Sequence, residues 1–221
     1  MKRLLYILLG VFALTACQQH AEQGVGDCVL ELDVVRANVP VVATRAIDAD
    51  LAVTVLDVGG AEYVSYSAGE VPQKIVLEPG TFTVCAYTDN QESWHTANDG
   101  RGEGCYYASQ QIEMEYDHFI RLTMAVPMTN YAVGLELPEL FDELFTSYQF
   151  TLKNGTREVI LRDGEEAYFS VADGGFTYAL STVNADGANN AHDFIEVDSV
   201  QSGKKYLISY DYGLKAVRRE L

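Results

Sequence analysis

The cysteine at position 17 has the most clearly defined chemistry in this 221-residue sequence. It follows a basic start, an apolar run over 4–14 and the small residues that end at position 16. A basic start, a short apolar stretch and small residues before a cut site define a secretory signal peptide. The apolar run is only about half of the roughly 20 residues that a membrane-spanning helix needs. We therefore predict a signal peptide over 1–16, with cleavage directly before Cys17.

The ending LTAC at 14–17 resembles the bacterial lipobox, in which the cysteine is acylated and becomes the first residue of the mature protein. Acyl chains such as palmitate contribute about 0.8 kcal/mol per buried methylene, and stable anchoring takes more than one chain. The resemblance implies a lipoprotein attached through Cys17 to the outer membrane and displayed at the cell surface. The polar residues that follow indicate a tether over 17–26. The alternative is an ordinary signal peptide that happens to contain a cysteine.

The charge balance restricts the partners of the mature chain. Cleavage before Cys17 removes Lys2 and Arg3, which leaves 13 basic residues (15 − 2) against 32 acidic ones, a formal charge of −19. Nucleic acid and anionic headgroups both require a basic surface, so nucleic acid is excluded as a partner. An apolar share of 48% is typical of a globular chain.

Three further cysteines, at positions 28, 85 and 105, would lie in an oxidising compartment. One disulfide and one buried free thiol is the simplest arrangement of an odd number. Cys85 lies in an expected strand and Cys105 opens the next one, so we expect these two to pair. The sequence has no CxxC motif, and neither a thiol-redox site nor a zinc ribbon is indicated.

No catalytic constellation is recognisable in the sequence. The four histidines are scattered without metal-ligand spacing, and neither a nucleophile elbow nor a glycine-rich phosphate loop with lysine occurs. The many carboxylates are typical of a solvated surface. An oxygen-rich run over 186–193 does not follow the order of a calcium loop, and we interpret it as a polar turn. We therefore predict a protein that is not an enzyme and that uses no metal or cofactor.

One aromatic group could bind a sugar. Trp94, the only tryptophan, lies in the polar stretch 90–104, and Tyr106 and Tyr107 follow it. A saccharide needs an aromatic face for stacking and hydrogen-bonding groups at the rim. This pattern favours a glycan-binding loop. The alternative is that Trp94 closes the end of a hydrophobic core and that the tyrosines are strand residues with solvated hydroxyls.

The elements that would position these residues are short strands. Apolar residues recur with a period of two rather than 3.6, which indicates β-structure. Asn-Gly at 154–155 and Asp-Gly at 163–164 are typical hairpin turns. Helical spacing over 139–145, after a proline, predicts one short helix. The expected strands span 29–34, 51–56, 74–77, 81–87, 119–124, 131–137, 148–152, 158–161, 167–171, 176–180, 194–197 and 206–212.

Short strands separated by such turns are typical of sandwiches and barrels. A boundary at 127–130 divides the chain into halves of about 100 residues, a common β-sandwich size. We therefore predict an all-β chain of two tandem antiparallel β-sandwich domains over 27–127 and 128–221, with the short helix at the start of the second. No long linker separates the halves, so they should pack against each other.

The order of the motifs resembles a family of Bacteroidetes lipoproteins related to fimbrillins, the subunits of strand-exchanged surface fimbriae. The resemblance covers most of the chain, and Cys85 and Cys105 are additions to the family pattern. It rests on the lipobox, CVLELDV at 28–34, ATRAIDADLAVTVLD at 43–57, LEPGTFTVCAY at 77–87, CYY at 105–107 and TNYAVGLEL at 129–137.

The resemblance implies a structural or adhesive component of a fimbrium. A protease would cut after Arg45, before Ala46, and remove the first strand at 29–34. A strand from a like subunit would then fill the groove and satisfy its unpaired backbone groups. Host molecules or glycans would be the ligands. Two alternatives stay open: Arg45 lies in an ordinary loop of an uncut lipid anchor, or the chain is a surface glycan-binding lipoprotein that uses Trp94.

Overall fold

The structure is a computed structural model, and strands make up most of it. The expectation of an all-β chain is confirmed. In the described part of the chain, no helix has the length and apolar character needed to cross a membrane. Four segments are described, 28–37, 47–191, 193–211 and 216–220.

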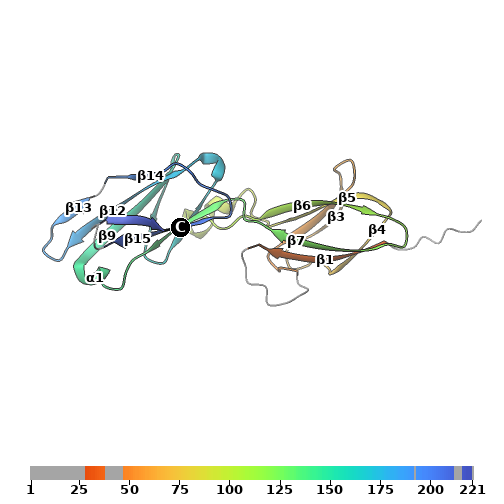
Figure 1. Cartoon of the computed structure of the whole chain (residues 1–221), viewed down its shortest axis with the longest axis horizontal. Coiled ribbons are helices and arrows are strands. Elements are labelled where there is room, and N and C mark those ends of the chain that lie inside the picture. Colours follow the sequence, from red (N-terminus) through yellow and green to blue (C-terminus); the bar gives the residue numbers. More distant parts are fainter. Residues whose placement is uncertain (1–27, 38–46, 192, 212–215, 221) are drawn as a thin grey trace, which may run out of the picture.

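The first half is built from two sheets that enclose one hydrophobic core (Figure 1). One sheet has the order β4-β1-β7 and the other the order β3-β2-β5-β6. Alternate side chains of these strands point inward, as the period of two predicts. The strands are β1 (Cys28–Arg36), β2 (Ala52–Leu56), β3 (Glu62–Tyr66), β4 (Lys74–Leu77), β5 (Gly80–Tyr87), β6 (Tyr107–Met114) and β7 (Phe119–Val126).

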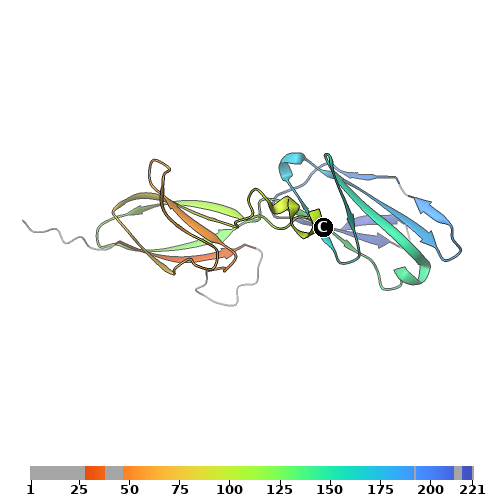
Figure 2. The same ribbon diagram turned by 180° about the vertical axis from the view of Figure 1, so that it is seen from behind.

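The second half repeats this plan around a core of its own. One sheet has the order β10-β9-β12-β13, with β14 also paired to β12, and the other the order β11-β8-β15-β16. Figure 2 shows the two halves arranged end to end. The elements are β8 (Tyr131–Glu136), α1 (Phe141–Leu144), β9 (Phe145–Asn154), β10 (Arg157–Leu161), β11 (Glu166–Phe169), β12 (Phe176–Asn184), β13 (Asn189–Ala191), β14 (Ile195–Val197), β15 (Lys205–Asp211) and β16 (Ala216–Glu220).

Two features differ from the sequence expectations. Each half contains one parallel strand pair, β1 with β7 and β8 with β15, so the sheets are mixed rather than purely antiparallel. An alternating pattern places side chains on faces but does not encode strand direction, which explains the error. Strands β3, β13 and β16 were not expected. Strand β3 is largely exposed, and β13 is a short asparagine-rich segment.

The predicted helix is present but short. Helix α1 covers four residues within the expected range 139–145, and its buried member is Phe141. It ends where Phe145 takes extended backbone angles and begins β9. The helix is therefore a single turn that adds the Phe141 side chain to the second core.

The two halves contact each other where β7 leads into β8. Asn130, at this connection, is 3% exposed. Its side chain accepts a hydrogen bond from the Cys105 N–H at 3.1 Å and donates one to the Glu103 carbonyl at 2.8 Å. Arg101 forms an ion pair with Glu165 at 3.0 Å. The loop before β6 is thus tied to the second half by backbone and side-chain contacts.

Candidate functional site

Strand β1 lies in the middle of its sheet, and both of its edges are paired. It runs antiparallel to β4 and parallel to β7. Because side chains alternate between the faces of a strand, one set of β1 residues points into the first core. All four members of that set are 0% exposed, namely Cys28, Leu30, Leu32 and Val34. The strand therefore supplies both backbone pairing and core volume to the first half.

The outer face of β1 is acidic. Glu31 is 5% exposed and accepts a hydrogen bond from Arg121 at 3.1 Å. On the same face, Oδ1 of Asp33 is buried and has no hydrogen-bond partner among the described residues. A buried acceptor left without a partner costs about 1–3 kcal/mol. The core side of β1 therefore buries its side chains completely, whereas the outer side leaves one buried carboxylate oxygen without a hydrogen bond.

The end of β1 is fastened by a charged cluster. The Arg36 guanidinium contacts the carboxylates of Asp48 and Asp50, each at 2.7 Å, and lies 5.4 Å from the centre of the Tyr106 ring. Burial disfavours ionisation of Asp48, but hydrogen bonds from Arg36 and the Asp50 N–H outweigh it and lower the pKa of that carboxyl. The cluster thus favours a charged Asp48 at neutral pH.

The expected processing and lipidation residues, Arg45, Ala46 and Cys17, lie outside the described residues. The described chain resumes at Ile47, which forms a parallel bridge with Val34. The Asp48 N–H donates to the Val34 carbonyl at 2.8 Å. Val34 and Ile47, which lie before and after the segment with Arg45, are therefore side by side in the structure.

Trp94 lies at the junction between the halves rather than on an open surface. It belongs to the 3-10 turn Trp94–Thr96, and its ring is half-buried. The guanidinium of Arg157, from β10 of the second half, lies 5.7 Å from the Trp94 ring and 4.9 Å from that of Phe169. Arg157 also donates hydrogen bonds to the carbonyls of Tyr168 and Gly100. Burial of the Arg157 side chain lowers its pKa.

The structure does not bring the three expected sugar-binding aromatics onto one surface. Tyr106 is half-buried and packs against the first core. Tyr107 points to the opposite face of its strand, as successive residues do, and is 42% exposed. Its hydroxyl lies 3.7 Å from the Cys85 thiol. With Trp94 partly covered by Arg157, these residues form separate contacts rather than a platform.

The expected disulfide between Cys85 and Cys105 is not formed. Cys85 and Cys105 are both buried thiols that are not joined in a disulfide. In the pairing of β5 with β6, Cys85 lies opposite Ser109. Cys105 is four residues earlier in the chain, about 13 Å along an extended strand at roughly 3.3 Å per residue. That separation exceeds the Cα–Cα limit of about 7 Å for a disulfide.

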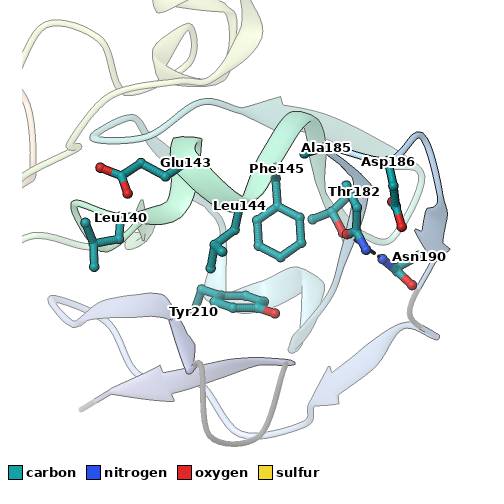
Figure 3. A pocket seen from close by; sticks show the side chains of 10 residues that line it. Leu140, Glu143, Leu144, Phe145, Thr182, Ala185, Asp186, Asn190 and Tyr210 are labelled. Atoms are coloured by element: carbon teal, nitrogen blue, oxygen red, sulfur yellow. Dashed lines mark hydrogen bonds between the residues drawn. The ribbon is translucent and has the colours of Figure 1, made fainter.

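A hollow that the sequence reasoning missed is bordered by α1 and β13 (Figure 3), which lie at the end of the second half away from the first (Figure 1). Its volume is about 890 Å³. It opens where α1, the start of β9, the end of β12, β13 and β15 meet. One signal was present in the sequence, because Asp186 and Asn190 of the oxygen-rich run 186–193 line the hollow. Ten residues line it, namely Leu140, Glu143, Leu144, Phe145, Thr182, Asn184, Ala185, Asp186, Asn190 and Tyr210.

The described residues hold no group of three or more histidine, cysteine, aspartate or glutamate side chains that could bind a metal ion.

Residues 26–218 match the family described as "Domain of unknown function (DUF4493)". The chain belongs to this family. A search for relatives among curated proteins finds no match.

Several solved structures are similar to this chain. A candidate cell adhesion protein from Bacteroides uniformis has a TM-score of 0.52 and 12% identity, over 88% of this chain and 97% of that one. A second, from Bacteroides ovatus, has a TM-score of 0.45 and 11% identity, over 90% and 96% of the two chains. Candidate polysaccharide binding proteins from Bacteroides thetaiotaomicron have a TM-score of 0.44 and 8% identity, over 89% and 98%. At such identities the first similarity shows a common fold.

Proposed function

We propose that this chain is a cell-surface adhesion component that assembles with like subunits by β-strand addition. In this proposal, residues 27–127 and 128–221 are two tandem β-sandwich domains. The observation that carries the proposal is the position of β1. This first strand is paired on both sides and has four fully buried side chains. The segment that contains Arg45 joins it to the part of the chain that follows.

Loss of β1 would create a groove with a defined chemistry. The facing edges of β4 and β7 would carry unpaired N–H and C=O groups, and four apolar positions in the first core would be vacated. A strand with apolar residues at alternate positions satisfies both requirements at once. A second copy of this chain could supply such a strand. The unsatisfied carboxylate oxygen of Asp33 disfavours the resident strand and so makes its exchange less costly.

Cleavage between Arg45 and Ala46 would convert β1 from a covalent to a non-covalent part of the domain. After the cut, the contacts of Arg36 with Asp48 and Asp50 would still fasten the end of the strand. The cut form should therefore keep β1 until a competing strand displaces it.

In the same proposal, the signal peptide 1–16 is removed and Cys17 is acylated, with 17–26 as the tether to the outer membrane. An uncut subunit keeps its lipid and serves as an anchor. A cut subunit loses its lipid together with β1 and enters the polymer. The shared fold with a candidate cell adhesion protein supports this class of function.

The test is the intact mass and N-terminal sequence of the protein recovered from the native cell surface, for the wild type, Arg45→Ala and Arg162→Ala. Arg162 is exposed at a turn of the second half and serves as a matched control. We expect wild type and the control to begin at Ala46 and to form ladders on gels after mild denaturation. Arg45→Ala should keep an acylated Cys17 and remain monomeric. A monomeric, uncut wild type with no ladders in any sample would refute assembly by strand addition.

A further inference from the structure

The hollow at the far end of the second half has a rigid aromatic wall (Figure 3). The rings of Phe145 and Tyr210 lie 5.5 Å apart at an interplanar angle of 77°. Both also pack on the buried ring of Phe141, at 4.6 and 5.1 Å. At the mouth, Leu140 and Leu144 are 55% and 49% exposed. An apolar surface of this kind is formed before any ligand arrives, so little ordering is needed on binding.

The opposite wall is polar. The side chain of Asn190 donates a hydrogen bond to the Asn184 side-chain oxygen at 2.8 Å. This bond leaves the amide nitrogen of Asn184 and the amide oxygen of Asn190 without a partner among the described residues. Asp186 accepts one hydrogen bond, from the Ala188 N–H at 3.2 Å, through Oδ1. Its second oxygen makes no hydrogen bond within the described part of the chain. The wall therefore offers both a donor and acceptors to a ligand.

The backbone fixes this polar wall in place. The register of β12 with β9 shifts between Val183 and Asn184, which marks a bulge. Bulges redirect side chains at the ends of strands. Across β12 and β13, Thr182 pairs with Asn190, and both line the hollow. The amides of Asn184 and Asn190 thus face the same space from neighbouring strands.

The charge of the lining selects the class of ligand. Its charged residues are Glu143 and Asp186, and none of the ten described lining residues is basic. An anionic ligand would be repelled without a compensating cation. A purely apolar ligand would bury the amides without partners, which costs free energy. A ligand with an apolar face and several neutral hydroxyls fits both walls.

We propose that this hollow binds a neutral saccharide, packed against the rings of Phe145 and Tyr210 and hydrogen-bonded by Asn184, Asp186 and Asn190. Its volume of about 890 Å³ accommodates one or two sugar rings. The elements that border the hollow, α1 and β13, lie at the end of the molecule away from the first half, which contains β1 (Figure 1). If Cys17 anchors the chain as proposed above, this end faces away from the membrane. Sugar binding itself is independent of strand exchange.

The experiment measures binding of lactose and cellobiose, with 3′-sialyllactose as the anionic counterpart of lactose, to the full mature chain by calorimetry and saturation-transfer NMR. Asn190→Ala tests the polar wall. Asn189→Ala is the matched control, because Asn189 precedes it on the same exposed strand and points to the other face. Phe145→Leu tests the aromatic wall, and Trp94→Ala tests the loop at the junction.

We expect a neutral disaccharide to bind and 3′-sialyllactose to bind at least roughly tenfold more weakly. Asn190→Ala should weaken binding roughly fivefold, and Phe145→Leu roughly tenfold. Asn189→Ala and Trp94→Ala should bind as the wild type does. Three outcomes would overturn the proposal: no binding of either neutral sugar up to about 10 mM, preference for the sialylated sugar, or binding lost only in Trp94→Ala. Because the assay uses uncut monomer, failure of strand exchange would leave its result unchanged.

Discussion

Replacing Leu32 by alanine should destabilise the first half of the protein and leave the second half unchanged. Leu32 is 0% exposed and belongs to the first core. Removing three carbons forfeits roughly 2.4 kcal/mol of transfer free energy, at about 0.8 kcal/mol per methylene. The cavity left behind adds to this loss, and buried leucine-to-alanine replacements cost about 2.7–5.0 kcal/mol. We expect the free energy of unfolding of the first half to fall by about 3 kcal/mol.

The assay is calorimetric and urea unfolding of the full chain with two control variants. Val35→Ala changes the outer face of the same strand, where the side chain is half-buried, and should cost less than about 1 kcal/mol. Leu152→Ala removes a fully buried side chain from the second core and should shift the unfolding of that half instead. The three variants therefore assign each transition to a core.

A reversed result would refute the assigned position of β1. A slip of one residue exchanges the two faces of a strand. If Val35→Ala cost more than Leu32→Ala, the core would contain the other face. The groove inferred for strand addition would then have the wrong pockets, and the proposed exchange would lose its basis.

Three further outcomes follow from other contacts. Arg157→Ala should increase quenching of Trp94 fluorescence by acrylamide, because it removes the guanidinium beside the ring; unchanged quenching would contradict that packing. The lowered pKa of Asp48 stabilises the fold above its unfolded value of about 3.9, and this contribution is lost as pH falls through the folded value. The stability difference between wild type and Asp48→Asn should therefore shrink below about pH 4 in melting experiments. Gly175→Ala should unfold the second half, because its Cβ would lie 1.9 Å from a backbone carbonyl oxygen. Gly155→Ala has open space but a φ of 56°, so it should lower the free energy of unfolding, measured in urea, by only about 1 kcal/mol.

The period of two was sufficient to locate most strands. The expected strands at 29–34 and 81–87 correspond to β1 and β5. Alternation is local, however, and it contains no information on which strand lies beside which. The parallel pairing of β1 with β7 and the position of Cys85 opposite Ser109 both depend on contacts between distant segments.

The candidate sites were harder to predict for the same reason. Trp94 looked exposed because its neighbours in sequence are polar, but its ring meets Arg157 from the other half. The wall of the hollow contains Phe145, the first residue of β9, and Tyr210, the residue before the last of β15. Each alone has the appearance of an ordinary strand aromatic. Only the fold brings them together with the asparagines near position 190.

The parallel pairing of β1 with β7 also governs when the first half can fold. Glu31 and Arg121, which face each other on these strands, are 90 residues apart in the chain. Contacts of such high contact order form slowly, because loop-closure entropy is lost before the pairing is gained. During synthesis from the N-terminus, β1 emerges first but has no parallel partner until β7 has followed it. The first half therefore stays incomplete until β7 is available, and the pairing of β7 closes it around the strand that was made earliest.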